Sequence, residues 1–293
     1  MSRLEAVGDV DVYRGGGSIT GAELAARVAG KQALLSMVTD TVDRAVIAAG
    51  TELRVIANVA VGYNNIDVAA AREQGIVVTN TPDVLTDATA DFTLALMLAV
   101  TRRLGEGERM VRDGAWKGWA FDQLLGMQLR GKQLGVVGFG RIGRAVADRA
   151  AAFGMTVAHT SRSGGGLPLD RLLATSDVVS LHVPLTPETR HLIGQPELAR
   201  MKRSAYLINT TRGPVVDEAA LAWALKNRII SGAGLDVYER EPEIHPDLLP
   251  LDNVVLAPHL GSATTETRTA MADLAARNVV AVLSGEPPLT PVA

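Results

Sequence analysis

Short runs of Val, Ile and Leu alternate with longer segments of helical periodicity in two zones of the chain, which predicts βαβ units and parallel sheets. In the first zone we expect strands at 33–38, 54–59 and 77–80, a weaker opening strand at 10–13, and helices at 41–49 and 68–74. In the second zone we expect strands at 134–139, 156–160, 178–183, 205–209, 233–237 and 253–257. Six such strands are enough for a complete doubly wound sheet.

Two long helical segments frame the second zone. The first runs from 87 to about 103 with Thr86 or Asp87 as its N-cap, and the second covers 264–283. One helix leaving the first zone and one returning after the second predict an inserted domain. We therefore expect an α/β protein of two doubly wound parallel-sheet domains, one formed by 1–81 and 265–293 and the other by 82–264.

Composition narrows the classes of function. The 293 residues are 47% hydrophobic and 21% charged, which excludes global disorder, and the net charge of -3 favours neither nucleic acid nor an anionic membrane as a partner. The chain has no Cys, so disulfides, thiolate metal sites and Cys nucleophiles are excluded. No His or carboxylate spacing typical of a metal site occurs. The N-terminus lacks the apolar stretch of a signal peptide, and the apolar run 92–100 is too short to span a bilayer, so we expect a soluble cytoplasmic protein.

A glycine motif marks the start of the second zone. Gly138, Gly140 and Gly143 follow the strand LGVV and precede a helical segment, the context that a dinucleotide-binding turn requires. The first glycine permits the tight turn, the second allows close approach of a pyrophosphate, and the third allows the helix to pack on the strand. The N–H groups at the start of the helix then face the phosphates. The motif predicts a dinucleotide-binding site.

The end of the next strand indicates which dinucleotide is preferred. An acidic residue about 20 residues after the motif would bind the ribose 2′-hydroxyl of NAD. This sequence instead has Ser161-Arg162-Ser163, and no acid lies between Arg149 and Leu169. A hydroxyl and a guanidinium suit a 2′-phosphate, so we predict NADP(H), with NAD(H) as the alternative.

Three polar residues follow consecutive later strands of the predicted sheet. Arg212 lies in NTTRG, Glu241 in YEREP and His259 in PHLGSAT, each just past the carboxyl end of a strand, where open α/β sheets bind ligands. His exchanges protons near neutral pH, and a carboxylate bonded to its ring orients it. Arg presents a planar fork to a substrate carboxylate. We predict that these three residues are catalytic.

The other histidines have less specific contexts. We expect His182 to be a hydrogen-bonded structural residue, and His191 and His245 to face solvent. For His159 a contact with the cofactor and a half-buried position in a strand are both open.

Seven motifs together resemble one enzyme family. They are ANVAVGYNNID at 57–67, VVTNTPDVLTDATAD at 77–91, LGVVGFGRIG at 134–143, SLHVPLTPETRHLI at 180–193, LINTTRGPVVDE at 207–218, GAGLDVYEREP at 232–242 and VVLAPHLGSAT at 254–264. From about Leu4 onward, the chain is similar to the D-isomer-specific 2-hydroxyacid dehydrogenases, most closely to their glyoxylate/hydroxypyruvate reductase branch. The resemblance implies a Rossmann cofactor domain inserted into a flavodoxin-like substrate domain, a homodimer built through the cofactor domain, and catalytic roles for Arg212, Glu241 and His259.

The resemblance also implies further site residues. Backbone N–H groups of Val61 and Gly62, with Arg212 and His259, would hold the substrate. The residues implied to contact the cofactor are Arg141 and Ile142 at the pyrophosphate, Thr210, Thr211, Asp236 and His259 around the nicotinamide, and Pro184 and Thr189 at the adenosine half. For Asp236 a turn-capping role is equally open.

The sequence departs from the family in two places. Relatives usually carry a strand and most of a helix before the segment that matches 4–13, so we expect the substrate domain to lack the usual first strand of its sheet. The segment after Ser163 is also short, which trims the wall of the adenosine pocket.

We therefore predict an NAD(P)H-dependent enzyme that reduces glyoxylate and hydroxypyruvate to 2-hydroxy acids, with His259 as the general acid. Two alternatives remain open at this point, a D-3-phosphoglycerate dehydrogenase-like enzyme and a dinucleotide-sensing, corepressor-like interaction protein. The expected partner is the small acid substrate, bound between the two domains.

Overall fold

The computed structural model describes residues 2–162 and 164–292, so Met1, Ser163 and Ala293 lie outside the described residues. The chain divides into two compact units, one made of Met1–Leu85 and Thr264–Ala293 and the other of Thr86–Ala263. Of the three residues used above to argue for NADP(H), Ser163 therefore has no described position.

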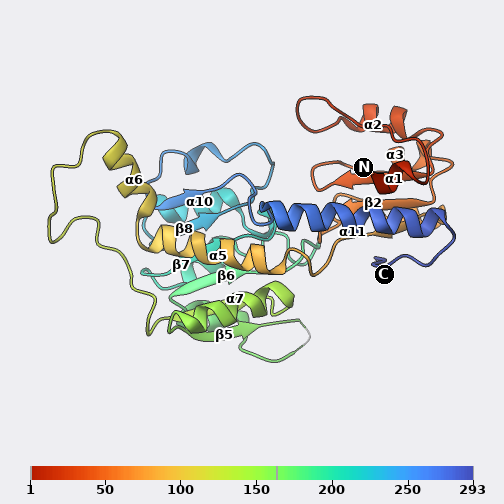
Figure 1. The fold of residues 1–293 in the computed structure, drawn as a ribbon. Helices are drawn as coiled ribbons and strands as arrows, with labels where there is room; N and C mark the ends of the chain where they lie inside the picture. Colours follow the sequence, from red (N-terminus) through yellow and green to blue (C-terminus); the bar gives the residue numbers. More distant parts are fainter. Residues whose placement is uncertain (1, 163, 293) are drawn as a thin grey trace. The chain divides into compact units, whose positions relative to one another are not determined.

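The first unit is built around a parallel sheet in the order β1-β2-β3. Its strands are β1 (Ala33–Met37), β2 (Val55–Val59) and β3 (Val77–Thr79), and its helices are α1 (Ser2–Glu5), α2 (Gly21–Val28), α3 (Arg44–Ala49), α4 (Val68–Glu73) and α11 (Thr265–Leu283). Alternate residues of β2 point to opposite faces, so Ile56 packs with α2, α3 and α4, while Val55 and Ala57 pack against α11. Figure 1 shows α11 running along β2. Both faces of β2 are therefore covered, as its apolar residues on the two faces require.

The predicted opening strand at 10–13 does not form, and this expectation was wrong. The segment is tied to α2 instead, because Asp11 pairs with Arg27 at 2.5 Å and the Arg27 guanidinium lies 5.4 Å from the centre of the Tyr13 ring. Among the described residues, no strand forms backbone hydrogen bonds with this segment as a sheet partner. Its side-chain contacts with Arg27 therefore hold it in place. β1 is accordingly an edge strand of the sheet.

The second unit contains one parallel sheet in the order β5-β4-β6-β7-β8-β9. Its strands are β4 (Gln133–Val137), β5 (Thr156–Thr160), β6 (Val178–Leu181), β7 (Tyr206–Asn209), β8 (Gly232–Leu235) and β9 (Val254–Leu256). The order reverses between β4 and β6, and crevices at such switch points are where doubly wound sheets bind ligands. The α/β class and the parallel Rossmann-type sheet are confirmed.

Helices cover both faces of this sheet. The helices of this unit are α5 (Thr86–Thr101), α6 (Leu104–Arg112), α7 (Arg141–Ala152), α8 (Leu169–Thr175), α9 (Gln195–Arg200) and α10 (Glu218–Lys226), with short 3₁₀ turns at Gly213–Val215 and Pro246–Leu248. Of these, α6 buries none of its residues and does not cover the sheet. α5 and α7 lie side by side (Figure 1), and α7 packs on β4 while α5 packs on β7 and β8. Met97 of α5 and Val146 of α7 belong to one apolar core. α8, α9 and α10 form a second apolar core with the opposite face. No helix in the described part of the chain is long and apolar enough to cross a membrane.

Candidate active site

Three loops after neighbouring strands carry the predicted catalytic residues. Arg212 follows β7, Glu241 follows β8 and His259 follows β9. These strands are adjacent and parallel, so all three loops leave the same edge of the sheet. The topology thus gathers residues that are far apart in the sequence.

Glu241 and His259 form a direct pair. His259 Nδ1 lies 2.8 Å from Glu241 Oε2, and the Tyr238 N–H donates to Glu241 Oε1 at 3.0 Å. Burial alone would raise the pKa of Glu241, but the hydrogen bond and charge of His259 outweigh it and lower that pKa. The carboxylate is therefore ionised near neutral pH and accepts a hydrogen from Nδ1, which leaves Nε2 as the ring atom that can exchange a proton with a ligand.

Asp236 fixes the turn that presents His259. Its carboxylate is 1% exposed and accepts the N–H groups of Leu260 at 2.6 Å and Gly261 at 2.7 Å, while its carbonyl accepts the His259 N–H at 2.9 Å. Burial raises the pKa of Asp236, and the two N–H bonds act against that rise. His259 has a φ of 56°, a left-handed conformation that costs free energy in a non-glycine residue. The turn-capping role left open by the sequence is therefore present, whereas a contact of Asp236 with cofactor stays a prediction.

Gly213 brings the Arg212 loop against the Glu241 loop. A Cβ at Gly213 would lie 1.8 Å from the Tyr238 carbonyl carbon, so only glycine allows this approach. The Arg212 guanidinium donates to the Thr211 carbonyl at 2.8 Å. The backbone carbonyl of Arg212 accepts from the Asn209 side-chain amide at 3.0 Å. Burial lowers the pKa of Arg212 while the Glu241 charge raises it, and a guanidinium in this setting stays cationic.

The glycine motif forms a cradle that fits a dinucleotide. Gly138 has a φ of 94°, and a Cβ there would lie 2.5 Å from the His182 carbonyl oxygen; a Cβ at Gly143 would lie 2.2 Å from the Gly138 oxygen. At Gly140, by contrast, a Cβ would meet nothing within 4 Å. Gly140 is the N-cap of α7 and provides no side-chain cap, so Arg141 and Ile142 start the helix beside open space. A pyrophosphate can approach the backbone only where this space is kept free.

The loops expected at the adenosine half are ordered by their own hydrogen bonds. The Ser161 hydroxyl donates to the Gly164 carbonyl at 3.0 Å, and Arg162 is exposed to solvent. The Thr189 hydroxyl donates to the Pro184 carbonyl at 2.6 Å and so closes the turn that follows β6. These positions leave the cofactor contacts of all four residues as predictions.

Thr210 and Thr211 fix the start of the Arg212 loop. The hydroxyls of Thr210 and Thr93 are 2.9 Å apart, which ties the loop to α5. Thr211 donates its hydroxyl to the Val183 carbonyl and its N–H to the Asn209 side chain. Their predicted contacts with the nicotinamide remain untested by this geometry.

In the first unit, amide side chains hold the predicted substrate loop. Asn80 Nδ2 donates to the Val61 carbonyl at 2.8 Å, and Asn58 Nδ2 donates to the Gly62 carbonyl at 3.0 Å. Asn58 is fully buried and also bonds Asn65. Each carbonyl lies in one plane with the N–H of the next residue, so these bonds fix the N–H directions of Gly62 and Tyr63. The Val61 N–H is fixed in the same way, because the Ala60 carbonyl accepts the Thr81 N–H at 2.8 Å. Sequence reasoning missed Asn58 and Asn80, because an Asn inside or just after a strand carries no local signal of its long-range partner.

The remaining histidines differ in their contacts. His182 bonds Ser180 at 2.8 Å, and burial lowers the pKa of His182 to about 3, so it is a neutral structural residue as expected. His159 is half-buried and stacks on Phe139 with ring centres 4.0 Å apart. His191 is exposed, as expected, and pairs with Glu239 at 3.0 Å. His245 is half-buried, so it faces solvent only in part, and its ring accepts the Asp247 N–H at 3.3 Å.

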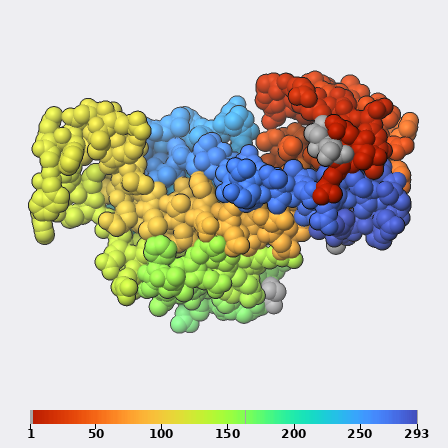
Figure 2. All heavy atoms as spheres, viewed as in Figure 1, coloured from red at the N-terminus to blue at the C-terminus, as the bar shows by residue number. Residues whose placement is uncertain are grey.

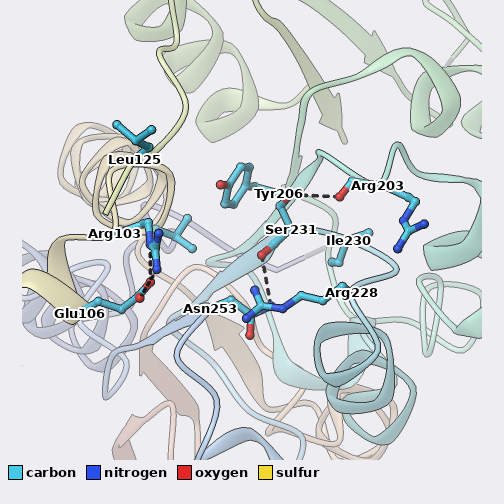
Figure 3. A pocket seen from close by; sticks show the side chains of 10 residues that line it. Arg103, Glu106, Leu125, Arg203, Tyr206, Arg228, Ile230, Ser231 and Asn253 are labelled. Carbon is cyan, nitrogen blue, oxygen red and sulfur yellow. Dashed lines mark hydrogen bonds and ion pairs between the residues drawn. The ribbon is translucent and has the colours of Figure 1, made fainter. Parts of the chain in front are cut away.

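A cavity of about 330 Å³ lies at the opposite edge of the same sheet (Figure 3). Tyr206, Ser231 and Asn253, near the amino ends of β7, β8 and β9, line it together with Arg103 and Arg228. None of the predicted catalytic, substrate or cofactor residues contributes to it. In the described part of the chain, no group of three His, Asp or Glu side chains could hold a metal ion.

Comparisons with known proteins show which family the chain resembles. The family model for the NAD-binding domain of D-isomer-specific 2-hydroxyacid dehydrogenases matches residues 94–261. A glyoxylate reductase of Thermococcus litoralis is 52% identical over 270 residues, covering 87% of this chain and 82% of the relative. One from Korarchaeum cryptofilum is 48% identical over 301 residues, covering 98% and 90%.

Solved structures extend the similarity to the whole chain. A Thermus thermophilus protein superposes with a TM-score of 0.94 at 49% identity, covering 100% of this chain and 96% of that one. An NADPH-dependent glyoxylate/hydroxypyruvate reductase of Sinorhizobium meliloti, solved with NADP and malonate, gives a TM-score of 0.86 at 39% identity, covering 94% and 88%. The chain belongs to the D-isomer-specific 2-hydroxyacid dehydrogenase family.

Proposed function

We propose that this enzyme reduces small 2-oxo acids, glyoxylate and hydroxypyruvate first, to the corresponding 2-hydroxy acids with a nicotinamide dinucleotide. The observation that carries the proposal is the His259–Glu241 pair, with 2.8 Å between Nδ1 and Oε2. The loops that carry this pair leave the sheet at the same strand ends as the loop that carries Arg212. Relatives named as glyoxylate reductases at about 50% identity support the substrate class.

Three residues of the second unit are assigned separate roles in the reaction. A reduced nicotinamide, when bound, supplies a hydride for the carbonyl carbon of the substrate. His259 donates the Nε2 proton to the carbonyl oxygen, and Glu241 stabilises and orients the protonated ring through Nδ1. Arg212 binds the substrate carboxylate and polarises the carbonyl with its fixed positive charge. The product is the D-2-hydroxy acid where it is chiral.

The substrate carboxylate is also assigned to the N–H groups of Val61 and Gly62. Their carbonyls are held by Asn80 and Asn58, which supports a backbone arrangement fixed before substrate arrives. Replacing Asn80 with Ala is expected to raise KM for glyoxylate with a smaller effect on kcat, measured by steady-state kinetics. An unchanged KM would contradict the assignment of the substrate carboxylate to the backbone of Val61 and Gly62.

We propose NADP(H) as the preferred cofactor, with the pyrophosphate at Gly138, Gly140, Arg141, Ile142 and Gly143. The exposed Arg162, beside Ser161 and with no acid at this strand end, supports recognition of a 2′-phosphate. Pro184 and Thr189 are assigned to the adenosine half. Thr210, Thr211 and Asp236 are assigned to the nicotinamide side.

We propose that the enzyme is a homodimer built through α6 and the loop that follows it. Large apolar side chains on this segment are exposed, namely Leu104, Val111, Trp116, Trp119, Phe121 and Leu125, with Trp119 at 82% and Phe121 at 83%. Figure 2 shows the segment, in yellow, standing out from the rest of its unit. A concentrated apolar surface of this kind marks a protein interface. Replacing Trp119 and Phe121 with Ser is expected to halve the mass measured by light scattering, and an unchanged mass would place the interface elsewhere.

The direct test of the reaction is a matrix of initial rates. Glyoxylate and hydroxypyruvate are each combined with NADPH and NADH, and oxidation of D-3-phosphoglycerate is measured beside them. Turnover of the oxo acids with NADPH preferred supports the whole proposal. Preference for NADH would retain the reaction and overturn the role of Arg162, whereas turnover of D-3-phosphoglycerate alone would reassign the substrate.

A further inference from the structure

Two glutamates outside the predicted site exchange hydrogen bonds across the loop that carries Glu241. The Glu218 N–H donates to Glu239 Oε1 at 2.9 Å, and the Glu239 N–H donates to Glu218 Oε1. Glu218 is the first residue of α10, and Glu239 lies between Tyr238 and the catalytic Glu241. Each carboxylate thus binds the backbone of the other glutamate.

The second oxygens of these carboxylates extend the link. Glu218 Oε2 accepts the His245 N–H at 3.2 Å, so one buried carboxylate, 6% exposed, holds both ends of the segment 239–245. Glu239 Oε2 lies 3.0 Å from His191 Nε2 and 3.8 Å from Arg190. Neither glutamate contacts Arg212, Glu241 or His259 in the described hydrogen bonds.

Between the two anchors, the segment is otherwise held by the bonds of the Glu241 side chain, the partly buried Ile244 and one isolated bridge between Arg240 and Glu243. Glu241 is in this segment, and its reach to His259 depends on the path of the backbone between 239 and 245.

We propose that Glu218 is a positioning residue for the reaction, acting through the segment 239–245 to keep Glu241 in contact with His259. This inference rests on the proposed function, because it assigns Glu218 to the general-acid pair. Glu218 touches neither substrate nor cofactor in this assignment. Its contribution is the orientation of the proton donor.

The substitution Glu218→Gln tests the proposal with little change in volume. An amide has one acceptor oxygen and one NH₂ group, so it cannot accept from both the Glu239 and the His245 N–H groups. One end of the segment is released, and we expect kcat to fall roughly tenfold with KM for the cofactor unchanged. In a Glu241→Gln background the same substitution is expected to change kcat less than twofold. Equal losses in the two backgrounds, or no loss in either, would overturn the proposal.

Asp217→Ala is the matched control. Asp217 is the N-cap of the same helix and accepts the Ala220 N–H at 2.9 Å, so its loss weakens the helix end without releasing the segment. We expect a lower Tm with kcat retained and with no coupling to Glu241→Gln.

A readout independent of turnover separates this inference from the function itself. The ring resonances of His259, assigned with His259→Gln, are titrated by NMR without substrate. Glu218→Gln is expected to move the titration midpoint in the direction produced by Glu241→Gln, while Asp217→Ala leaves it in place. A shifted midpoint in an enzyme without turnover would uphold the positioning role and refute the proposed reaction. An unmoved midpoint would overturn the positioning role alone.

Discussion

Replacing Gly213 with Ala should separate the loops that carry Arg212 and Glu241. An added Cβ would lie 1.8 Å from the Tyr238 carbonyl carbon and 1.9 Å from its oxygen, whereas real Cβ atoms essentially never approach below 3.0 Å. The loops must therefore move apart by at least the difference, 3.0 − 1.8 = 1.2 Å. The clash is with backbone, so no side-chain rotation can relieve it.

A displacement of this size is large for catalysis. Misplacement of catalytic groups by about 1 Å costs on the order of 10²-fold in rate, so we expect kcat for glyoxylate reduction in Gly213→Ala to fall by about that factor. Overpacking should also lower the free energy of unfolding by about 1–3 kcal/mol, measured by urea denaturation.

Gly194→Ala is the control for this experiment. A Cβ at Gly194 would meet its nearest neighbour, the Glu197 carboxylate, at 3.5 Å, an ordinary contact in the same unit. We expect wild-type kcat from this variant. A Gly213→Ala enzyme with unchanged kcat would refute the claim that the close approach of the two loops aligns the site.

Two further predictions follow from charge. Unfolded His182 takes up a proton below its ordinary pKa of 6.5, whereas the folded residue stays neutral until about 3, so stability is lost as the pH falls through this window, at up to about 1.4 kcal/mol per pH unit. His182→Asn should flatten that part of a plot of unfolding free energy against pH, and an unchanged slope would contradict the burial argument. Arg162→Ala should raise KM for NADPH at least tenfold and leave KM for NADH within twofold; equal effects on both cofactors would show that Arg162 does not contact the 2′-phosphate.

The positions of the strands along the sequence could be predicted because each strand has a local pattern of apolar residues. Runs such as Val178–Leu181 are fully buried and mostly apolar, and each expected strand of the second sheet forms within two residues of its predicted limits. β4 ends at Val137 rather than at 139 because Gly138 already adopts the left-handed turn of the glycine motif. The strand expected at 10–13 failed for the opposite reason, since strand formation depends on a partner that a local pattern does not reveal.

The supports of the site could not be predicted in the same way. Arg212, Glu241 and His259 each follow a strand, so the parallel topology alone places them together. The contacts around these residues join distant parts of the sequence. The carboxylates of Glu218 and Glu239 each accept the backbone N–H of the other glutamate, and the Asp236 carboxylate binds the turn after His259. No sequence period or spacing signals these contacts, because they depend on how the loops pack.

The most direct test of the account is the rate of glyoxylate reduction by His259→Gln compared with the wild-type enzyme at saturating NADPH. Gln cannot donate a proton as an acid, so we predict that kcat falls roughly 10²–10⁴-fold while the Tm stays within a few degrees of wild type. Turnover close to the wild-type rate would contradict the assignment of His259 as the general acid and, with it, the role given to Glu241.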